Sequence, residues 1–163
     1  MIVDVFTIAA GFVLRVAAGA VVIGVAMSHW LVICTLLLAL FLGFSKRRYE
    51  LVTLSGDGKL HRQVLADYNP LFLDMMIGIV TSATVVSYAL YTVSQETVQR
   101  FHTDRLLLTL PFVLYGIFRY LYLVYHKNVG GDPSRTLVSD GPLLTNVVLW
   151  VLTCAVIIYI ANP

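Results

Sequence analysis

The sequence predicts an all-α, polytopic membrane protein, a transmembrane helix bundle with five spans. Its 163 residues are 59% hydrophobic and 12% charged, with a mean hydropathy of +0.86. A soluble domain is about 45–50% apolar and about 25% charged. Backbone groups in lipid must be satisfied internally, and the apolar stretches show no alternation of period two. We therefore expect helices rather than barrel strands, in one transmembrane domain over residues 1–163.

The five predicted spans cover about residues 5–23, 30–44, 71–93, 106–124 and 143–160. A ~30 Å hydrocarbon core requires about 20 residues of helix, so the second span is short unless its serine ends are counted. The long polar connections, 45–70 and 125–142, fall on one side and hold seven of the eleven Lys and Arg residues. Because Lys and Arg accumulate on the cytoplasmic side, we expect the long loops and the N-terminus of a multi-pass cell-membrane protein there.

The remaining composition excludes several classes. A formal net charge of +2 is too small to indicate nucleic-acid binding. Cys34 and Cys154 lie inside apolar runs and are interpreted as small buried hydrophobic residues. The sequence has no Walker-type loop, no HExxH motif and no short secretory signal.

Two arginines fall inside predicted spans, where a charge is costly and marks a candidate functional site. Arg15 shares a helical face with Gly11 and Gly19, so it either grips a phosphate or carboxylate in a cavity or pairs with an acidic residue of a neighbouring helix. Arg119 shares a face with Tyr115 and Tyr122. That face either forms a polar wall of a cavity or belongs to an interfacial aromatic belt.

Asp74 and Asp4 stand at the starts of the third and first spans. Asp74 is interpreted either as a metal ligand or partner of a ribose hydroxyl or basic group, or as a charge stabilised by the helix N-terminus. The same alternatives apply to Asp4.

The stretch Ser45–Leu51, SKRRYEL, is the strongest candidate for phosphate recognition. Lys46, Arg47 and Arg48 are either topogenic anchors or phosphate ligands, and a continuing helix would stack Lys46 on Glu50. The second long loop offers Gly130 and Gly131, which permit close backbone approach to a ligand, and Asp140, which is suited to cap the fifth span. Together the two loops suit a metal-bound diphosphate or a phosphate ester.

Three segments carry a resemblance to a known family: AAGFVLRVAAGA, LALFLGFSKRRYEL and LPFVLYGIFRYLYLVYHKNVGGDPSRTLVSDGPLL. They resemble the UbiA prenyltransferase superfamily, in particular its decaprenyl-phosphate phosphoribosyltransferase branch. The resemblance covers nearly the whole chain. It implies nine membrane helices around a cavity and Mg²⁺-assisted transfer of 5-phosphoribose from phosphoribosyl pyrophosphate to a polyprenyl (decaprenyl) phosphate. The product of that branch feeds cell-wall arabinan synthesis.

The five predicted spans match the last five of that family, and its NDxxDxxxD motif has no counterpart here. We therefore expect a C-terminal portion of a nine-helix UbiA-like fold, with an N-terminal half or a homo-oligomer as its partner. Prenyl transfer to another acceptor and a non-catalytic membrane subunit or fragment stay open as alternatives, with an anion transporter as a weaker third.

The resemblance and the charge pattern together suggest roles for ten residues. Lys46, Arg47 and Arg48 would bind the phosphates of the donor, while Glu50 and Asp74 would orient these cations or Mg²⁺. Arg15 and Arg119 would hold the phosphate of the acceptor lipid or the developing pyrophosphate. Hydrogen bonds would come from three tyrosines, Tyr49, Tyr115 and Tyr122. We predict Arg119, Glu50 and Asp74 as catalytic and leave the metal ligands open.

Overall fold

The computed structural model describes residues 2–24, 27–54, 69–127 and 131–161, and these residues are helical without strands. The elements are α1 (Ile2–Val22), α2 (His29–Leu54), α3 (Pro70–Val93), α4 (Gln95–Phe101), the 3-10 helix η2 (Arg105–Thr109), α5 (Leu110–His126), α6 (Pro133–Ser139) and α7 (Gly141–Ala161). Five helical segments are long and apolar enough to cross a membrane: α1, α2, α3, η2 with α5, and α7. The prediction of an all-α, multi-pass membrane protein is therefore confirmed.

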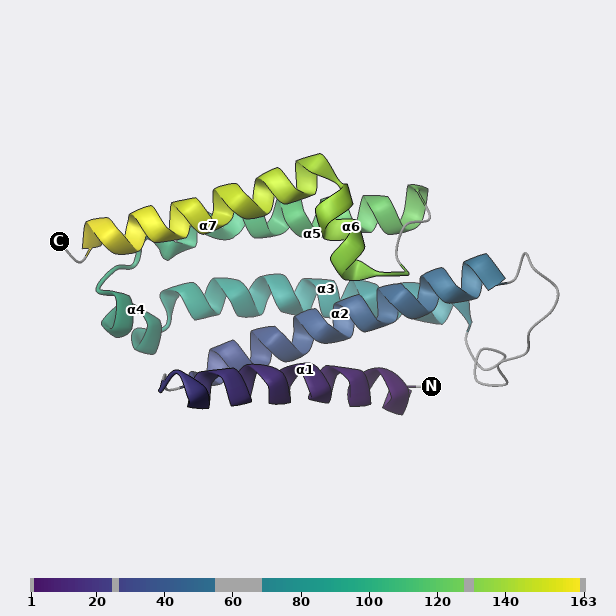
Figure 1. Ribbon diagram of the computed structural model, residues 1–163, viewed down its shortest axis with the longest axis horizontal. Helices are drawn as coiled ribbons and strands as arrows, with labels where there is room; N and C mark the ends of the chain where they lie inside the picture. Colours follow the sequence, from purple (N-terminus) through teal and green to yellow (C-terminus); the bar gives the residue numbers. More distant parts are fainter. Residues whose placement is uncertain (1, 25–26, 55–68, 128–130, 162–163) are drawn as a thin grey trace.

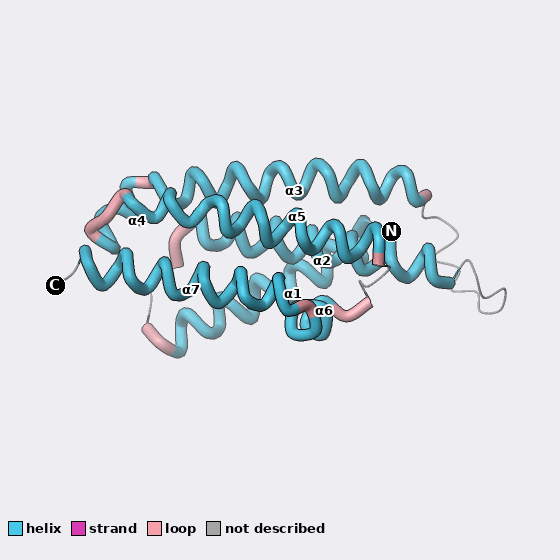
Figure 2. Tube along the Cα trace, turned by 90° about the horizontal axis from the view of Figure 1, so that it is seen from above, coloured by secondary structure: helices cyan, strands magenta, loops and turns pink. Residues whose placement is uncertain are grey.

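The long helices lie in two groups along one axis. Figure 1 shows α1, α2 and α3 together, with α5 and α7 beside them; α3 contacts α5, and α5 packs on α7. Figure 2 shows the same bundle from above, with α6 turned across its axis. The end of α2 and the start of α3 lie at the end of the bundle where the chain begins, and the C-terminal end of α7 lies at the opposite end (Figure 1).

Helix α2 is longer than predicted. The sequence pattern ended this span near residue 44 and assigned 45–70 to a loop, but the helix continues to Leu54. The residues after Ser45 include strong helix formers and no Gly or Pro. Arg47 and Glu50 also pair across one turn, with 2.6 Å between Nη1 and Oε2. The basic stretch is therefore held on a rigid helix, and the loop assignment of residues 45–54 is wrong.

Side-chain caps fix the ends of the helices that follow. The Asn69 side chain accepts a hydrogen bond from the backbone N–H of Leu71 at the start of α3. Asp132 accepts from the backbone of Ser134 and Arg135 at the start of α6. The prediction that Asp140 caps the fifth span is confirmed, because its Oδ2 accepts from the backbone N–H of Leu143 at 3.1 Å.

The core joins the two groups of helices. Val5 and Phe41 are buried with residues of α3, α5 and α7 in one cluster, which includes Leu73, Ile117 and Leu143. Helices α1 and α2 approach closely at Gly43, where an added Cβ would lie 2.8 Å from Cγ1 of Val5. This packing fixes α1 against the part of α2 that leads into the basic stretch.

Candidate functional site

A largely apolar cavity of about 860 Å³ runs between the two groups of helices. Its walls come from α2, α3, α5 and α7, with Ile8 and Phe12 of α1 at one edge. Lys46, Arg47 and Ser134 line it at the basic end, and Leu31 lines it 15 residues earlier on α2. At 1.5 Å per residue, these levels are about 22 Å apart. The cavity is therefore long and apolar, with cations at one end.

Cys34 and Cys154 both line this cavity. They are free thiols and are half-buried, on α2 and α7 respectively. The interpretation as small apolar residues within helices agrees with these positions, although neither side chain is fully buried.

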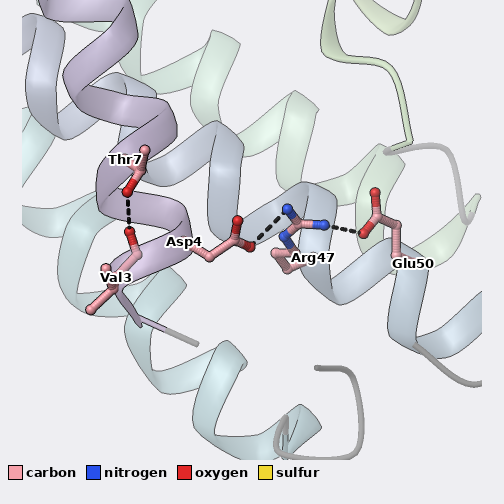
Figure 3. Close-up of polar contacts among 5 residues, drawn as sticks. All are labelled: Val3, Asp4, Thr7, Arg47 and Glu50. Atoms are coloured by element: carbon pink, nitrogen blue, oxygen red, sulfur yellow. Dashed lines mark hydrogen bonds and ion pairs between the residues drawn. The ribbon is translucent and has the colours of Figure 1, made fainter. Parts of the chain in front are cut away.

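Arg47 lies between two carboxylates. Its Nη2 is 2.7 Å from Oδ2 of Asp4 on α1, and its Nη1 is 2.6 Å from Oε2 of Glu50. Figure 3 shows the guanidinium bridging α1 and α2 in this way. The Arg47 side chain is 16% exposed, so the two acidic groups largely balance a charge that has been partly removed from water.

Arg48 joins three helices. Its Nε donates to Oδ1 of Asp74 on α3 at 2.6 Å, and its guanidinium carbon lies 3.8 Å from the ring centroid of Tyr125 on α5. The Tyr125 hydroxyl donates to the same Asp74 oxygen at 2.8 Å. Because a guanidinium over an aromatic face is attracted by the ring quadrupole, Asp74 and Tyr125 hold Arg48 from two directions.

Lys46 differs from both arginines. Its side chain is exposed, lines the cavity, and makes no ion pair within the described residues. Asp4, Glu50 and Asp74 each pair with one of the two arginines. Among the three consecutive cations, Lys46 therefore retains a charge that an incoming anion can meet.

Tyr49 packs against the second connection. A Cβ added to Gly131 would lie 2.6 Å from Cε1 of Tyr49 and 3.1 Å from its Cδ1. The expectation that the two long connections meet on one face is confirmed for these residues. The close approach that glycine permits here is to the Tyr49 ring, however, and Gly130 lies outside the described residues.

Arg119 pairs with an acidic residue at the start of α7. Its Nε and Nη2 donate to the two carboxylate oxygens of Asp140, each at 2.9 Å, and Arg119 does not line the cavity. Tyr115 and Tyr122 are 48% and 44% exposed and are also absent from the lining. The cavity wall on α5 instead comes from a different face: Phe112, Val113, Gly116, Ile117 and Tyr120. Arg119, Tyr115 and Tyr122 therefore lie on a face of α5 other than the one that lines this cavity.

The Arg119–Asp140 pair fixes the start of α7. The two hydrogen bonds from Arg119 hold the pKa of Asp140 below its ordinary value, and the backbone N–H of Leu143 acts in the same direction. The bidentate geometry favours an ionised Asp140. Arg119 thereby ties α5 to the cap of α7.

Arg15 satisfies neither of its two interpretations within the described residues. It is exposed on α1, does not line the cavity, and has no acidic partner there. Its guanidinium carbon lies 5.6 Å from the Phe12 ring centroid. Arg15 is therefore separated from the basic end of the cavity.

Two residues that hold the arginines were not identified as such from the sequence. Tyr125, which contacts Arg48 and Asp74, was not singled out as a site residue. Asp4, which pairs with Arg47, was left open between a ligand and a charge at a helix start. Their predicted depth in the membrane could have indicated the contact, because Asp4, Asp74 and the basic stretch all lie at the same predicted membrane boundary. Tyr120 was also missed: its buried hydroxyl, in a cavity-lining residue, has no hydrogen-bond partner within the described residues.

The fold and the site define a class: a multi-pass helical membrane protein with a lipid-sized apolar cavity that ends at a basic cluster. Within the described residues, no group of three or more His, Cys, Asp or Glu side chains is arranged to hold a metal ion. The cluster suits an anionic group attached to an apolar chain, because cations and an apolar tunnel adjoin.

Two curated relatives carry a more specific name, and no family model matches the chain. A protein of Corynebacterium glutamicum named decaprenyl-phosphate phosphoribosyltransferase is 29% identical over 161 residues, covering 98% of this chain and 48% of that protein. A protein of the same name from Mycolicibacterium smegmatis is 24% identical over 165 residues, covering 97% of this chain and 51% of that protein. These relatives confirm the resemblance to that branch, and this chain spans about half their length.

Proposed function

We propose that this chain is part of a membrane transferase that moves 5-phosphoribose from phosphoribosyl pyrophosphate to decaprenyl phosphate or a similar polyprenyl phosphate. The observation that carries the proposal is the apolar cavity of about 860 Å³ with Lys46 at its basic end. An isoprenoid tail suits the apolar walls, and its terminal phosphate suits the cation. The names of the two relatives support this choice of substrates, and the product would supply cell-wall arabinan synthesis.

The chemistry requires positioning and charge stabilisation. A phosphate oxygen of the lipid attacks the anomeric carbon of the donor and forms a new C–O bond. The bond from that carbon to pyrophosphate breaks, and pyrophosphate leaves with the electron pair. Because the attacking oxygen is already anionic, the step needs no general base. Positioned cations stabilise the charge that develops on the leaving group.

The basic cluster supplies these cations in our proposal. Lys46 binds a substrate phosphate directly. Arg47 binds a phosphate when that phosphate competes with Asp4 and Glu50 for its guanidinium. Asp74 acts as a positioning residue that holds Arg48 toward the site. Tyr49 contributes a hydrogen bond from the same helical segment.

The residues outside the basic cluster have other roles in our proposal. Arg119 serves as a positioning residue through Asp140 rather than as a catalytic residue, and Tyr115 and Tyr122 flank it on the same exposed face. Arg15 lies too far from the basic end to share a phosphate with Lys46, since the α1 residue level with the cluster is Asp4, 11 residues or about 16 Å away.

Mg²⁺ fits this proposal as a cofactor held mainly by substrate phosphates. Protein sites for Mg²⁺ commonly supply one or two carboxylates and leave the remaining positions to phosphates and water. Glu50 and Asp4, which converge on Arg47, are the candidate ligands. The ion would neutralise charge on the leaving pyrophosphate, while Lys46 and the two arginines orient the substrates.

We further propose that the basic end faces the cytoplasm, where a water-soluble sugar phosphate is available, and that the N-terminus lies there too. The distribution of Lys and Arg in the sequence supports this orientation. Residues 1–163 would form the C-terminal part of a nine-helix fold. The greater length of the relatives supports an additional half, which the family resemblance would place at the N-terminal side, and a homo-oligomer is the alternative.

The test measures transfer of labelled phosphoribose into lipid. Membranes would contain this chain with the unmatched part of the Corynebacterium relative, labelled phosphoribosyl pyrophosphate, Mg²⁺ and decaprenyl phosphate. Lys46→Gln removes a charge-assisted hydrogen bond worth about 1.5–3 kcal/mol, so we expect kcat/KM to fall about 10–150-fold. Lys127→Gln is the matched control, because Lys127 is also exposed but lies outside the cavity lining.

Two outcomes would contradict the proposal. Equal rates for Lys46→Gln and Lys127→Gln would show that Lys46 does not bind the substrate. Label transfer from a prenyl diphosphate to another acceptor, with none from phosphoribosyl pyrophosphate, would favour the alternative of prenyl transfer.

A further inference from the structure

Helix α1 is attached to the bundle along one side. Val5, Ala9 and Ala20 are its buried residues, and the Asp4–Arg47 ion pair joins it to α2. Its other sides are exposed, and Figure 1 shows α1 at the outer edge of the bundle. Contact with lipid explains why Val, Leu and Ile side chains are exposed on this helix. It does not explain why a cation lies among them.

Arg15 is that cation, and it lies far from both ends of α1. It follows Ile2 by 13 residues and precedes Val22 by seven, or about 20 Å and 10 Å of helix. Within the described residues, its charge meets only the Phe12 ring, at 5.6 Å. An arginine at this depth in lipid is unfavourable, and a single ring contact at an exposed site offsets little of that cost.

The face that carries Arg15 has room for another helix. Gly11 and Gly19 lie four residues to either side, and a Cβ added to either glycine would meet nothing within 4 Å. The same side of α1 adjoins the cavity, because Ile8 and Phe12, seven and three residues before Arg15, line it. A helix placed along this face would also cover the α1 edge of the cavity.

We propose that the face formed by Gly11, Arg15 and Gly19 binds a transmembrane helix of another polypeptide that carries an Asp or Glu at the depth of Arg15. A carboxylate would satisfy the guanidinium with bidentate hydrogen bonds, and the glycines would let the two backbones approach. The proposal extends the partner suggested above by assigning its binding face and its chemistry.

A second copy of this chain does not fit the charge requirement. Three of the nine acidic residues lie within the five long helices: Asp4, Glu50 and Asp74. Each lies within five residues of a helix end and already pairs with Arg47 or Arg48. In a parallel copy, Asp4 would lie 11 residues, or about 16 Å, from the level of Arg15. The two relatives contain about as much sequence again beyond the matched region, which is sufficient length for such a helix.

The experiment measures assembly and requires no substrate, so its result is independent of the proposed transferase activity. The full chain would be co-expressed with the tagged, unmatched part of the Corynebacterium relative, and its recovery on the tag would be measured in mild detergent. We expect recovery with the unaltered chain and with Arg15→Lys. We expect at least a tenfold loss with Arg15→Leu, which removes the charge while keeping an apolar helix in the membrane.

A second pair of variants separates charge from shape. Gly19→Leu would obstruct the proposed face and lower recovery. Gly78→Leu is the matched control, because Gly78 on α3 is another exposed glycine whose added Cβ meets nothing within 4 Å. Substituting Asn or Gln for each intramembrane Asp or Glu of the partner should identify one position whose loss is not additive with Arg15→Leu.

Several results would overturn the proposal. Equal recovery with the unaltered chain and Arg15→Leu would show that Arg15 reaches the headgroup region or faces lipid. Absence of recovery when both polypeptides are inserted would reject this partner. Arg15-dependent recovery of a differently tagged second copy would replace the acidic helix with self-association.

Discussion

The contact between Tyr49 and Gly131 offers a direct test of how the basic stretch is held. In Gly131→Ala, the new methyl group would lie 2.6 Å from Cε1 of Tyr49, whereas carbon atoms in contact are normally about 3.5–4.0 Å apart. The ring or the backbone must therefore move by roughly 1 Å. Overpacking of this kind costs about 1–3 kcal/mol.

The assay is thermal unfolding of the detergent-solubilised chain, followed by tryptophan fluorescence. For a protein of this size, each kcal/mol lowers Tm by roughly 2–4 °C, so Gly131→Ala should unfold about 2–12 °C lower. Gly141→Ala is the matched control, because its added Cβ meets nothing within 4 Å. That change should be neutral or slightly stabilising, since alanine restricts the unfolded chain.

A double variant makes the reasoning refutable. If the clash with the ring is the cause, Tyr49→Ala should remove most of the additional effect of Gly131→Ala. Equal Tm values for Gly131→Ala and Gly141→Ala, or full additivity of the Tyr49 and Gly131 changes, would show that the two connections do not meet as described.

Two other predictions concern the groups around the site. Tyr125→Phe keeps the ring beside Arg48 but removes the hydrogen bond to Asp74, so we expect the free energy of unfolding to fall by about 1 kcal/mol in the same assay; an unchanged value would show that the hydroxyl contributes nothing. The pKa of Asp140 is lowered by Arg119, so this pair should stabilise the chain above the ordinary carboxyl pKa of about 3.9 and lose its effect only as pH falls through the lower folded value. Asp140→Asn retains a capping side chain and should remove this acid dependence; an identical pH profile of stability for both proteins would contradict the role of the pair.

Hydropathy was sufficient to locate the five spans, because continuous apolar stretches of this length have few alternatives to a membrane helix. It did not show where α2 ends. The residues from Lys46 to Glu50 are polar but include strong helix formers, so the apolar region ended near residue 45 while the helix continued. Giving helix propensity more weight than hydropathy would have predicted the end of α2 more accurately.

The inward face of α5 was harder to predict. In a soluble helix, polar residues indicate the solvent side, but in a membrane bundle a polar stripe can face a cavity, a partner or the interface. The sequence therefore left Arg119 open between a cavity wall and an interfacial belt, whereas the structure pairs it with Asp140. No pattern in the sequence indicated that Gly116 and Tyr120 line the cavity, because glycine and tyrosine occur on every side of a membrane helix.

The length of α2 has a consequence for where charged chemistry takes place. Its 26 residues extend about 39 Å, about 9 Å more than the hydrocarbon core of a bilayer, and the cluster at Lys46 lies toward the final third of the helix. For the phosphorylated lipid proposed above as a substrate, this length would let the headgroup reach the cluster while it stays near the depth that it occupies in one leaflet. Its phosphate would avoid the cost of transfer into a low-dielectric interior, which amounts to several kcal/mol per ion. A rigid helix that projects beyond the apolar region would allow the lipid tail to stay in an apolar environment while the lipid headgroup stays hydrated.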